Sequence, residues 1–305
     1  MAPASLTTSL AGVEIQSPLI AASGTVGSVW EWAEVADTSY YGAAVSKSVS
    51  PTPWTGRSAP RVAPLAVGML NGIGIQNPGI EAWMETMRSR IVGTSVPVWG
   101  SAVAGDPEGF SLVSKGLSSV GVAAIEVNLS CPNLEDDHLF SFDSAASRDV
   151  VEAVVASVDI PVGAKLSPNT PDITDVARNC SAAGASFVVL TNTAFGFGIS
   201  LDSRMPLLSA GAGGYSGPGL KPLSLRCVYE VSRALPGLPI VGCGGVSSGS
   251  DVLEYLVAGA SAVQLGTVHL AEPKAGRRIH AELTAAMETL GETSLEAIIG
   301  TVGEW

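Results

Sequence analysis

Eight short apolar segments recur along this chain, and most of them are followed by a stretch with the residue spacing of a helix. Parallel strands that are covered by helices appear as nearly continuous runs of Val, Ile, Leu and Ala, and these segments match that pattern. Between them, residues 106–119, 147–157 and 174–183 carry apolar residues at three- and four-residue intervals, as amphipathic helices do. Strands are predicted at residues 18–22, 43–46, 96–102, 123–128, 161–166, 187–191, 239–243 and 262–266.

Eight strand–helix units predict one closed α/β barrel. The 305 residues suit a (β/α)8 TIM barrel, which needs roughly 250 residues, and no linker-like tract divides them. Residues 1–305 are therefore expected to form a single domain. Residues 5–15 predict a small N-terminal hairpin that turns at Ala11-Gly12 and closes the floor of the barrel. An open, doubly wound sheet is the alternative architecture.

The charge balance and the cysteine content exclude several classes of protein. A net charge of −12 and a pI of about 4.6 argue against binding to nucleic acid or to an anionic membrane. The four cysteines form no CxxC pair, which argues against a disulfide framework and against a zinc or iron–sulfur site on this chain. No segment resembles a signal peptide or has the apolar length of a membrane span, so we expect a soluble cytoplasmic protein.

Polar residues or glycines stand at the carboxyl ends of all eight predicted strands, where such barrels build their active sites. Lys47 and Lys165 both end apolar strands, although the chain has only five lysines. We expect both to point into the barrel mouth; snorkelling to solvent at the rim is the alternative. Gly244-Gly245 and Gly266-Thr267 end the last two strands, where backbone N–H groups can approach an anion, so a phosphorylated cofactor is predicted there.

The segment Asn128-Leu129-Ser130-Cys131-Pro132-Asn133 directly follows the fourth strand. The thiol of Cys131 can move a proton, and the flanking amides can hold a planar polar ring without a net charge. Pro132 removes one backbone donor and fixes φ, so this turn is expected to be stiff. A loop with a half-buried structural cysteine is the plainer interpretation.

Nine segments in chain order carry a resemblance to a known family: Ala22-Ser23-Gly24-Thr25, Ser46-Lys47-Ser48, residues 68–79, Asn128 to Asn133, Lys165 to Asn169, Thr191-Asn192-Thr193, residues 213–218, Gly244-Gly245 and Gly266-Thr267. Taken together, these segments resemble dihydroorotate dehydrogenases, specifically the catalytic subunit of the class 1B bacterial type. The resemblance implies bound FMN and the oxidation of (S)-dihydroorotate to orotate, a step of pyrimidine (UMP) synthesis. It implies that Cys131 removes the proton from substrate C5 while hydride passes from C6 to flavin N5.

The resemblance also assigns a binding role to each matching position. It places Lys165 beside the N1/O2 edge of the flavin, where a cation stabilises negative charge on the reduced ring. The substrate would contact Lys47, Asn71, Asn128, Asn133 and Asn192. The flavin ring and ribityl chain would contact Ala22, Ser23, Lys47, Ser48, Ser101, Asn128, Lys165 and Thr193, and the ribityl and phosphate end Gly217, Gly244, Gly245, Gly266 and Thr267.

Two long segments are expected to cover the site. Residues 50–78 are long for a connection and are predicted to contain some strand and to carry Asn71 over the mouth. Residues 134–142 would be the cover that follows Cys131, although they are acidic and aromatic where related chains tend to be glycine-rich. No role is assigned to His138, His269 or His280.

The resemblance implies partners, and it leaves rival functions open. A homodimer is expected, and a heterotetramer with a separate subunit whose FAD and [2Fe-2S] cluster pass electrons to NAD. One rival is a class 1A-type homodimer that reduces fumarate. Another is an enzyme like the pyrimidine-reducing domain of dihydropyrimidine dehydrogenase, where histidine is expected at the position of Asn133. A flavin-binding barrel without turnover is the rival from a different class.

Overall fold

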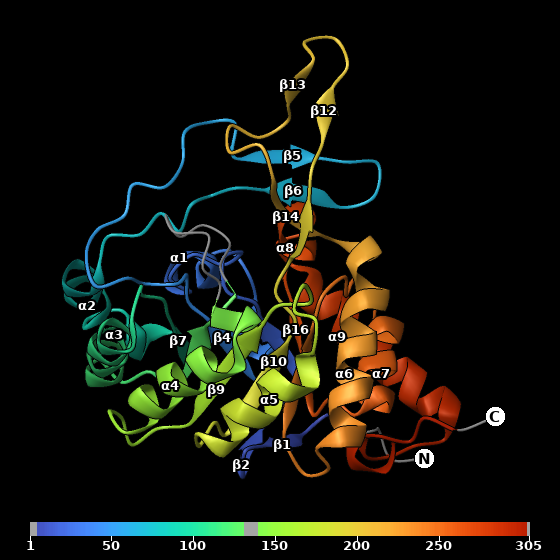
Figure 1. Ribbon diagram of the computed structural model, residues 1–305. Helices are drawn as coiled ribbons and strands as arrows, with labels where there is room; N and C mark the ends of the chain where they lie inside the picture. The colour runs from blue at the N-terminus through green and yellow to red at the C-terminus, as the bar shows by residue number, and fades with distance from the viewer. Residues whose placement is uncertain (1–4, 131–139, 304–305) are drawn as a thin grey trace.

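A closed barrel of eight parallel strands forms the centre of the computed structural model, which describes residues 5–130 and 140–303 (Figure 1). Neighbouring strands follow chain order, and the last one pairs with the first, with Val263 opposite Leu19. This closure confirms the TIM barrel and excludes the open sheet. The strands are β3 (Leu19–Ala21), β4 (Ala43–Val45), β7 (Val98–Ala102), β8 (Ala124–Asn128), β9 (Val162–Leu166), β10 (Phe187–Leu190), β15 (Ile240–Cys243) and β16 (Ala262–Leu265).

Every predicted strand is confirmed, and the differences lie at the ends. Four strands begin directly after a proline, at Pro18, Pro97, Pro161 and Pro239. Proline cannot donate a hydrogen bond to a sheet, although its carbonyl can still accept one, so the ladder starts one residue later than the apolar run. Each of these proline carbonyls does accept a backbone hydrogen bond from the neighbouring strand.

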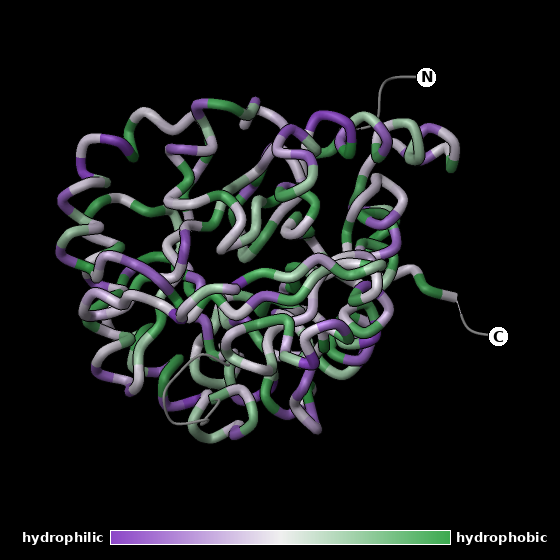
Figure 2. Tube along the Cα trace, turned by 90° about the horizontal axis from the view of Figure 1, so that it is seen from above, coloured by the Kyte–Doolittle hydropathy of each residue, from purple (hydrophilic) through white to green (hydrophobic). Residues whose placement is uncertain are grey.

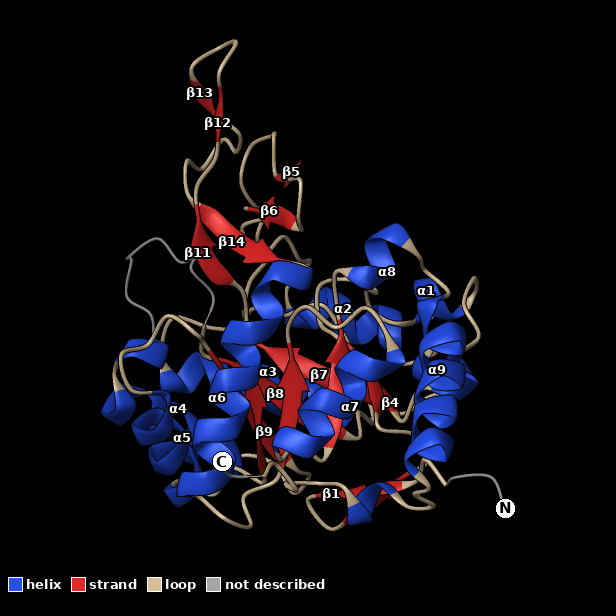
Figure 3. Ribbon diagram, turned by 90° about the vertical axis from the view of Figure 1, so that its right-hand side faces the viewer, coloured by secondary structure: helices blue, strands red, loops and turns tan. Residues whose placement is uncertain are grey.

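Helices surround the barrel (Figure 3). Polar side chains fix where several of them begin. Asp172 accepts a hydrogen bond from the N–H of Asp175, and Ser248 forms a capping box with Asp251. The predicted helix at 147–157 instead begins at Ser144, because Asp143 caps it. The helices are α1 (Trp30–Ala33), α2 (Ile80–Met87), α3 (Pro107–Ser119), α4 (Ser144–Val155), α5 (Ile173–Ala182), α6 (Lys221–Ala234), α7 (Gly249–Ala258), α8 (Val268–Ala271) and α9 (Ala275–Leu290), with 3-10 turns η1 (Thr38–Tyr40), η2 (Ile91–Gly93), η3 (Phe140–Phe142), η4 (Pro218–Leu220) and η5 (Leu295–Ala297).

The lower half of the barrel is packed with hydrocarbon and aromatic rings. Trp99 and Phe187 pack against each other inside it in a tilted arrangement, with ring centroids 5.1 Å apart. Leu10 and Ile15, from the predicted hairpin β1 (Thr8–Leu10) and β2 (Val13–Ile15), join the same cluster and close the floor. Apolar chain concentrates inside the ring of helices and polar chain on its outer side (Figure 2). Among the described residues, this packing fills the lower end of the barrel interior.

A second, smaller sheet rises above the open end (Figures 1 and 3). It combines β5 (Val62–Pro64) and β6 (Met69–Asn71) with β11 (Ala194–Gly196) and β14 (Gly213–Ser216), in the order β11-β14-β6-β5. The short hairpin of β12 (Ile199–Ser200) and β13 (Met205–Pro206) projects beyond it. The expectation of some strand within residues 50–78 is therefore confirmed. No described helix has the length and hydropathy to cross a membrane.

Candidate active site

A cavity of about 660 Å³ lies at the carboxyl ends of the barrel strands, within the size range of cofactor sites. Its walls come from strand ends around the barrel and from the smaller sheet, which contributes Val62, Pro64 and Met69. Backbone and polar side chains line the barrel side, and mostly apolar side chains line the cover. Such a cavity suits a flat ligand that is partly apolar and has polar edges.

The structure brings nearly all the predicted site residues to this one cavity. Ser101 is the exception among the described residues: it is fully buried behind Ser48, and their hydroxyl oxygens lie 2.9 Å apart. The hydroxyl of Ser101 thus supports the wall residue Ser48, and its contact with the cofactor stays a prediction. Cys131 and Asn133 lie outside the described residues. The predicted residues that line the cavity are Ala22, Ser23, Lys47, Ser48, Asn71, Asn128, Lys165, Asn192, Thr193, Gly217, Gly244, Gly245, Gly266 and Thr267.

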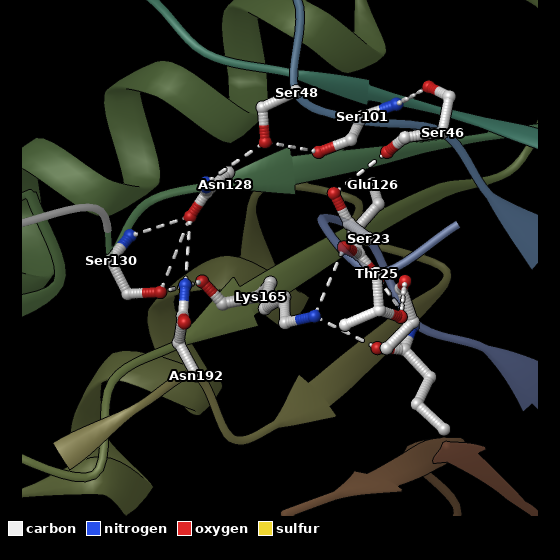
Figure 4. A network of polar contacts seen from close by, with 12 residues as sticks. Ser23, Thr25, Ser46, Ser48, Ser101, Glu126, Asn128, Ser130, Lys165 and Asn192 are labelled. Atoms are coloured by element: carbon white, nitrogen blue, oxygen red, sulfur yellow. Dashed lines mark hydrogen bonds and ion pairs between the residues drawn. The ribbon is translucent and has the colours of Figure 1, made fainter. Parts of the chain in front are cut away.

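A buried ammonium group stands in the cavity wall (Figure 4). Lys165 is only 6% exposed, and its Nζ donates to Oε1 of Gln264 at 2.9 Å and to Oε1 of Glu126 at 3.4 Å. Burial alone would lower the pKa of Lys165, but the Glu126 carboxylate more than offsets it and holds the pKa above its usual value. The lysine is therefore charged at neutral pH, and snorkelling is wrong for Lys165.

Glu126 and Gln264 are site residues that the sequence interpretation missed. Both are fully buried, and Gln264 Nε2 donates to Glu126 Oε2 at 2.5 Å. Glu126 lines the cavity. The available signal was a polar residue inside an otherwise apolar strand, because a buried carboxylate almost always has a charged partner.

Three asparagines line the cavity, and two of them, Asn128 and Asn192, hold each other in place (Figure 4). Asn192 donates to Oδ1 of Asn128 at 3.2 Å, and Asn128 donates to the hydroxyl of Ser48 at 3.2 Å. Asn71, on the cover sheet, donates to the carbonyl of Gly214 at 3.1 Å. Each amide group thus keeps one N–H without an acceptor among the described residues. These are the groups that a planar ring with amide edges could use.

The glycine-rich ends of the last two strands present open backbone donors. No acceptor among the described residues pairs with the N–H groups of Gly245, Gly266 or Thr267. A Cβ built on Gly266 would meet only Ala22, at 3.6 Å, and would otherwise occupy cavity space. Helix α7 begins nearby, but Asp251 already accepts hydrogen bonds from the N–H groups of Ser247 and Ser248 just before the helix, and Glu282 accepts one from its first residue, Gly249. An anion would therefore bind to the two turns themselves and not to the first turn of α7.

A buried histidine supports the wall from behind. Tyr41 and His269 join through the phenol oxygen and Nε2 at 2.8 Å, and Nδ1 lies 3.4 Å from the hydroxyl of the wall residue Thr25. Burial lowers the pKa of His269 to about 4, so the imidazole is neutral at neutral pH. The sequence interpretation gave His269 no role; its place is structural, beneath the loop that carries Thr25.

The fold and the cavity define a (β/α)8 barrel with a ligand-sized cavity at the carboxyl ends of its strands, where enzymes of this fold build their active sites. Comparison with known proteins shows the family. The family model described as dihydroorotate dehydrogenase matches residues 5–287. The chain belongs to the dihydroorotate dehydrogenase family and is an oxidoreductase.

Two relatives match the sequence of this chain over nearly its whole length. "Dihydroorotate dehydrogenase B (NAD(+)), catalytic subunit" of Geobacter sp. (strain M21) is 38% identical over 299 residues, covering 97% of this chain and 98% of the relative. The protein with the same description from Listeria innocua is 36% identical over 295 residues, covering 96% and 97%. A crystal structure of the enzyme from Eimeria tenella in complex with ferulenol matches with a TM-score of 0.82 at 19% identity, over 97% of this chain and 88% of that one, which shows a shared fold.

Proposed function

We propose that this protein oxidises (S)-dihydroorotate to orotate with FMN bound in the cavity, and that it works as a catalytic subunit that passes its electrons to NAD through a partner. One observation carries the proposal. A charged lysine, three asparagine amides with unused donors and a set of open backbone N–H groups line the same cavity. Its relatives named for this activity span almost the same length.

The residues present fit FMN. The open N–H groups of Gly245, Gly266 and Thr267 would hold the phosphate, and the lack of a side chain at Gly266 leaves room for it. The cover supplies apolar side chains such as Met69 for the ring system. Lys165 would donate to the ring edge. When bound, FMN supplies the acceptor for the hydride that leaves C6 of the substrate.

The amide groups fit the substrate. Dihydroorotate carries two ring amides and one carboxylate, so it needs several neutral donors and acceptors and one cation. Asn71, Asn128 and Asn192 offer amide groups from the cover and from two strand ends, and Lys47 lines the same cavity. Because Asn128 and Asn192 bond to each other, they would meet the substrate already oriented, at little further entropic cost.

The base that removes the C5 proton is proposed to be Cys131, on the resemblance of its motif. The contacts of Ser130, the residue directly before Cys131, support this assignment. Ser130 is buried, its N–H donates to Asn128 Oδ1 at 3.4 Å, and its hydroxyl donates to the carbonyl of Lys165 at 3.3 Å. Ser130 therefore lies beside the amide group of Asn128, at the end of strand β8. Loss of a proton from C5 and of a hydride from C6 forms the C5=C6 double bond of orotate.

Onward electron transfer is proposed to need a second subunit that carries FAD and a [2Fe-2S] cluster. The described residues contain no group of three or more His, Cys, Asp or Glu side chains that could hold a metal ion. The relatives are named as NAD(+)-linked catalytic subunits. A homodimer of this chain within a heterotetramer is the assembly that we propose.

Anaerobic mixing of the FMN-loaded protein with dihydroorotate tests the proposal. The flavin absorbance in the visible range is expected to bleach, and orotate is expected to form in equal amount. Adding NAD alone should leave the flavin reduced, whereas fumarate would reoxidise it if the enzyme were of the class 1A type. A flavin that stays oxidised in the presence of dihydroorotate would contradict the proposed activity.

A further inference from the structure

Glu126, Gln264 and Lys165 form a closed ring of hydrogen bonds from three barrel strands. The ammonium of Lys165 donates to both other residues, and Gln264 donates to Glu126. This arrangement fixes the orientation of the Gln264 amide, since its oxygen must face the ammonium and its nitrogen the carboxylate. An ammonium has three N–H groups, and the described residues accept two of them from Lys165. The third remains for a ligand in the cavity.

Stability alone does not explain why a carboxylate is buried here. Replacing a buried ion pair by apolar side chains of similar volume is often neutral or stabilising, because both charges lose their hydration. Glu126 is fully buried, and it lines the cavity together with Lys165. The carboxylate therefore sets the electrostatic potential that a ligand meets at this wall.

We propose that Glu126 is a positioning residue that acts through Lys165. It fixes the ammonium in the wall and offsets its charge, so that the bound flavin is not held too firmly in its reduced state. The inference rests on the proposed binding of FMN in this cavity. An unopposed lysine would stabilise the negative charge that a flavin gains on reduction. A flavin that must pass its electrons on needs a weaker stabilisation, and a neutral lysine–glutamate pair provides it.

Glu126→Gln tests the role with almost no change of shape. The substitution raises the net charge of the pair from zero to +1, so it should favour the reduced flavin. The midpoint potential of the bound FMN, measured by anaerobic titration against a reference dye, should rise. We expect the reduced state to gain at least tenfold in relative stability, which is a positive shift of about 30 mV or more for a two-electron couple.

Two controls separate this effect from a general change of charge or of structure. Glu85→Gln removes an exposed carboxylate from helix α2 and should leave the potential unchanged. In a Lys165→Met background, Glu126→Gln should change the relative stability of the reduced flavin less than threefold, because its partner is missing. A shift of equal size with and without Lys165 would mean that Glu126 acts on the flavin directly, which overturns the proposal.

A measurement without flavin tests the same coupling. Glu126→Gln should lower the melting temperature of the flavin-free protein, because it leaves an uncompensated buried ammonium. Combining it with Lys165→Met should restore most of that loss. If Glu126→Gln does not fold, Glu126→Asp offers a milder test. Its side chain is shorter by one methylene group, so the carboxylate lies farther from the Lys165 ammonium, and the potential should rise by a smaller amount.

The outcomes also separate this inference from the proposed function. A wild-type protein that binds no FMN, or whose FMN dihydroorotate does not reduce, would overturn both. A wild-type protein that passes those tests, with a Glu126→Gln potential that is unchanged or lower, would overturn only the role of Glu126.

Discussion

Adding one methyl group at Gly266 should weaken FMN binding without harming the fold. The φ angle at this position lies outside the left-handed region, and a Cβ would contact only Ala22, at 3.6 Å. Gly266→Ala should therefore leave the free energy of unfolding unchanged or raise it by about 0.4–1 kcal/mol, because alanine restricts the unfolded chain. The methyl group would, however, occupy the cavity beside the open N–H groups of Gly266 and Thr267.

The expected loss of affinity follows from the steric cost of an extra methyl group in a packed site, about 1–3 kcal/mol. That cost corresponds to a dissociation constant for FMN that is roughly 5- to 150-fold higher. Flavin fluorescence titration of the flavin-free protein measures it, and chemical denaturation checks the fold. Gly93→Ala is the matched control, since a Cβ there would meet nothing within 4 Å and Gly93 does not line the cavity. Equal FMN affinity for Gly266→Ala and wild type would refute this placement of the phosphate.

Three further predictions concern the base, the buried histidine and the partner. Cys131→Ala should keep FMN bound but slow its reduction by dihydroorotate by a factor of about 10² or more, as loss of a general base does; an unchanged rate in stopped-flow would contradict the assignment. The pKa of His269 is about 4 in the folded protein and near 6.5 when unfolded, so unfolding takes up a proton between these values. Stability should be complete above pH 6.5 and fall by up to about 3 kcal/mol towards pH 4. His269→Asn should remove most of that slope in urea denaturation at each pH, and an unaltered slope would assign the pH dependence to other groups. The isolated chain should reduce little NAD with dihydroorotate, and an FAD/iron–sulfur subunit should restore turnover; rapid NAD reduction by the chain alone would overturn the need for a partner.

The barrel could be predicted from the sequence because its signals are local. Each strand is an apolar run of four to seven residues, and four of them are preceded by a proline that marks where the ladder can start. The position of a residue at the carboxyl end of a strand also places it in the barrel mouth, whichever strand it comes from. This is why Lys165 and Asn192 could be expected in one site although no local pattern links them.

The cover sheet and the ion pair could not be predicted in the same way. Strands β6 and β14 are only three and four residues long, β14 begins with two glycines, and the two strands pair across more than 140 residues of sequence, so neither segment shows the alternation of an ordinary strand. Glu126 and Gln264 lie on β8 and β16, which are not neighbours in the barrel, and their contact depends on how far side chains reach across its interior. The sequence places Ser101 correctly on strand β7, but it does not show that the Ser101 hydroxyl bonds to the hydroxyl of Ser48 behind the cavity wall.

A crystal structure of the protein with FMN and orotate would test the central claim most directly, because that claim is the occupancy of one cavity by a flavin and a pyrimidine. The account predicts the flavin ring edge within hydrogen-bonding distance of Lys165 Nζ, and the phosphate on the N–H groups of Gly245, Gly266 and Thr267. It also predicts orotate against the amides of Asn128 and Asn192. A flavin bound elsewhere, or a pyrimidine that contacts neither amide, would contradict it.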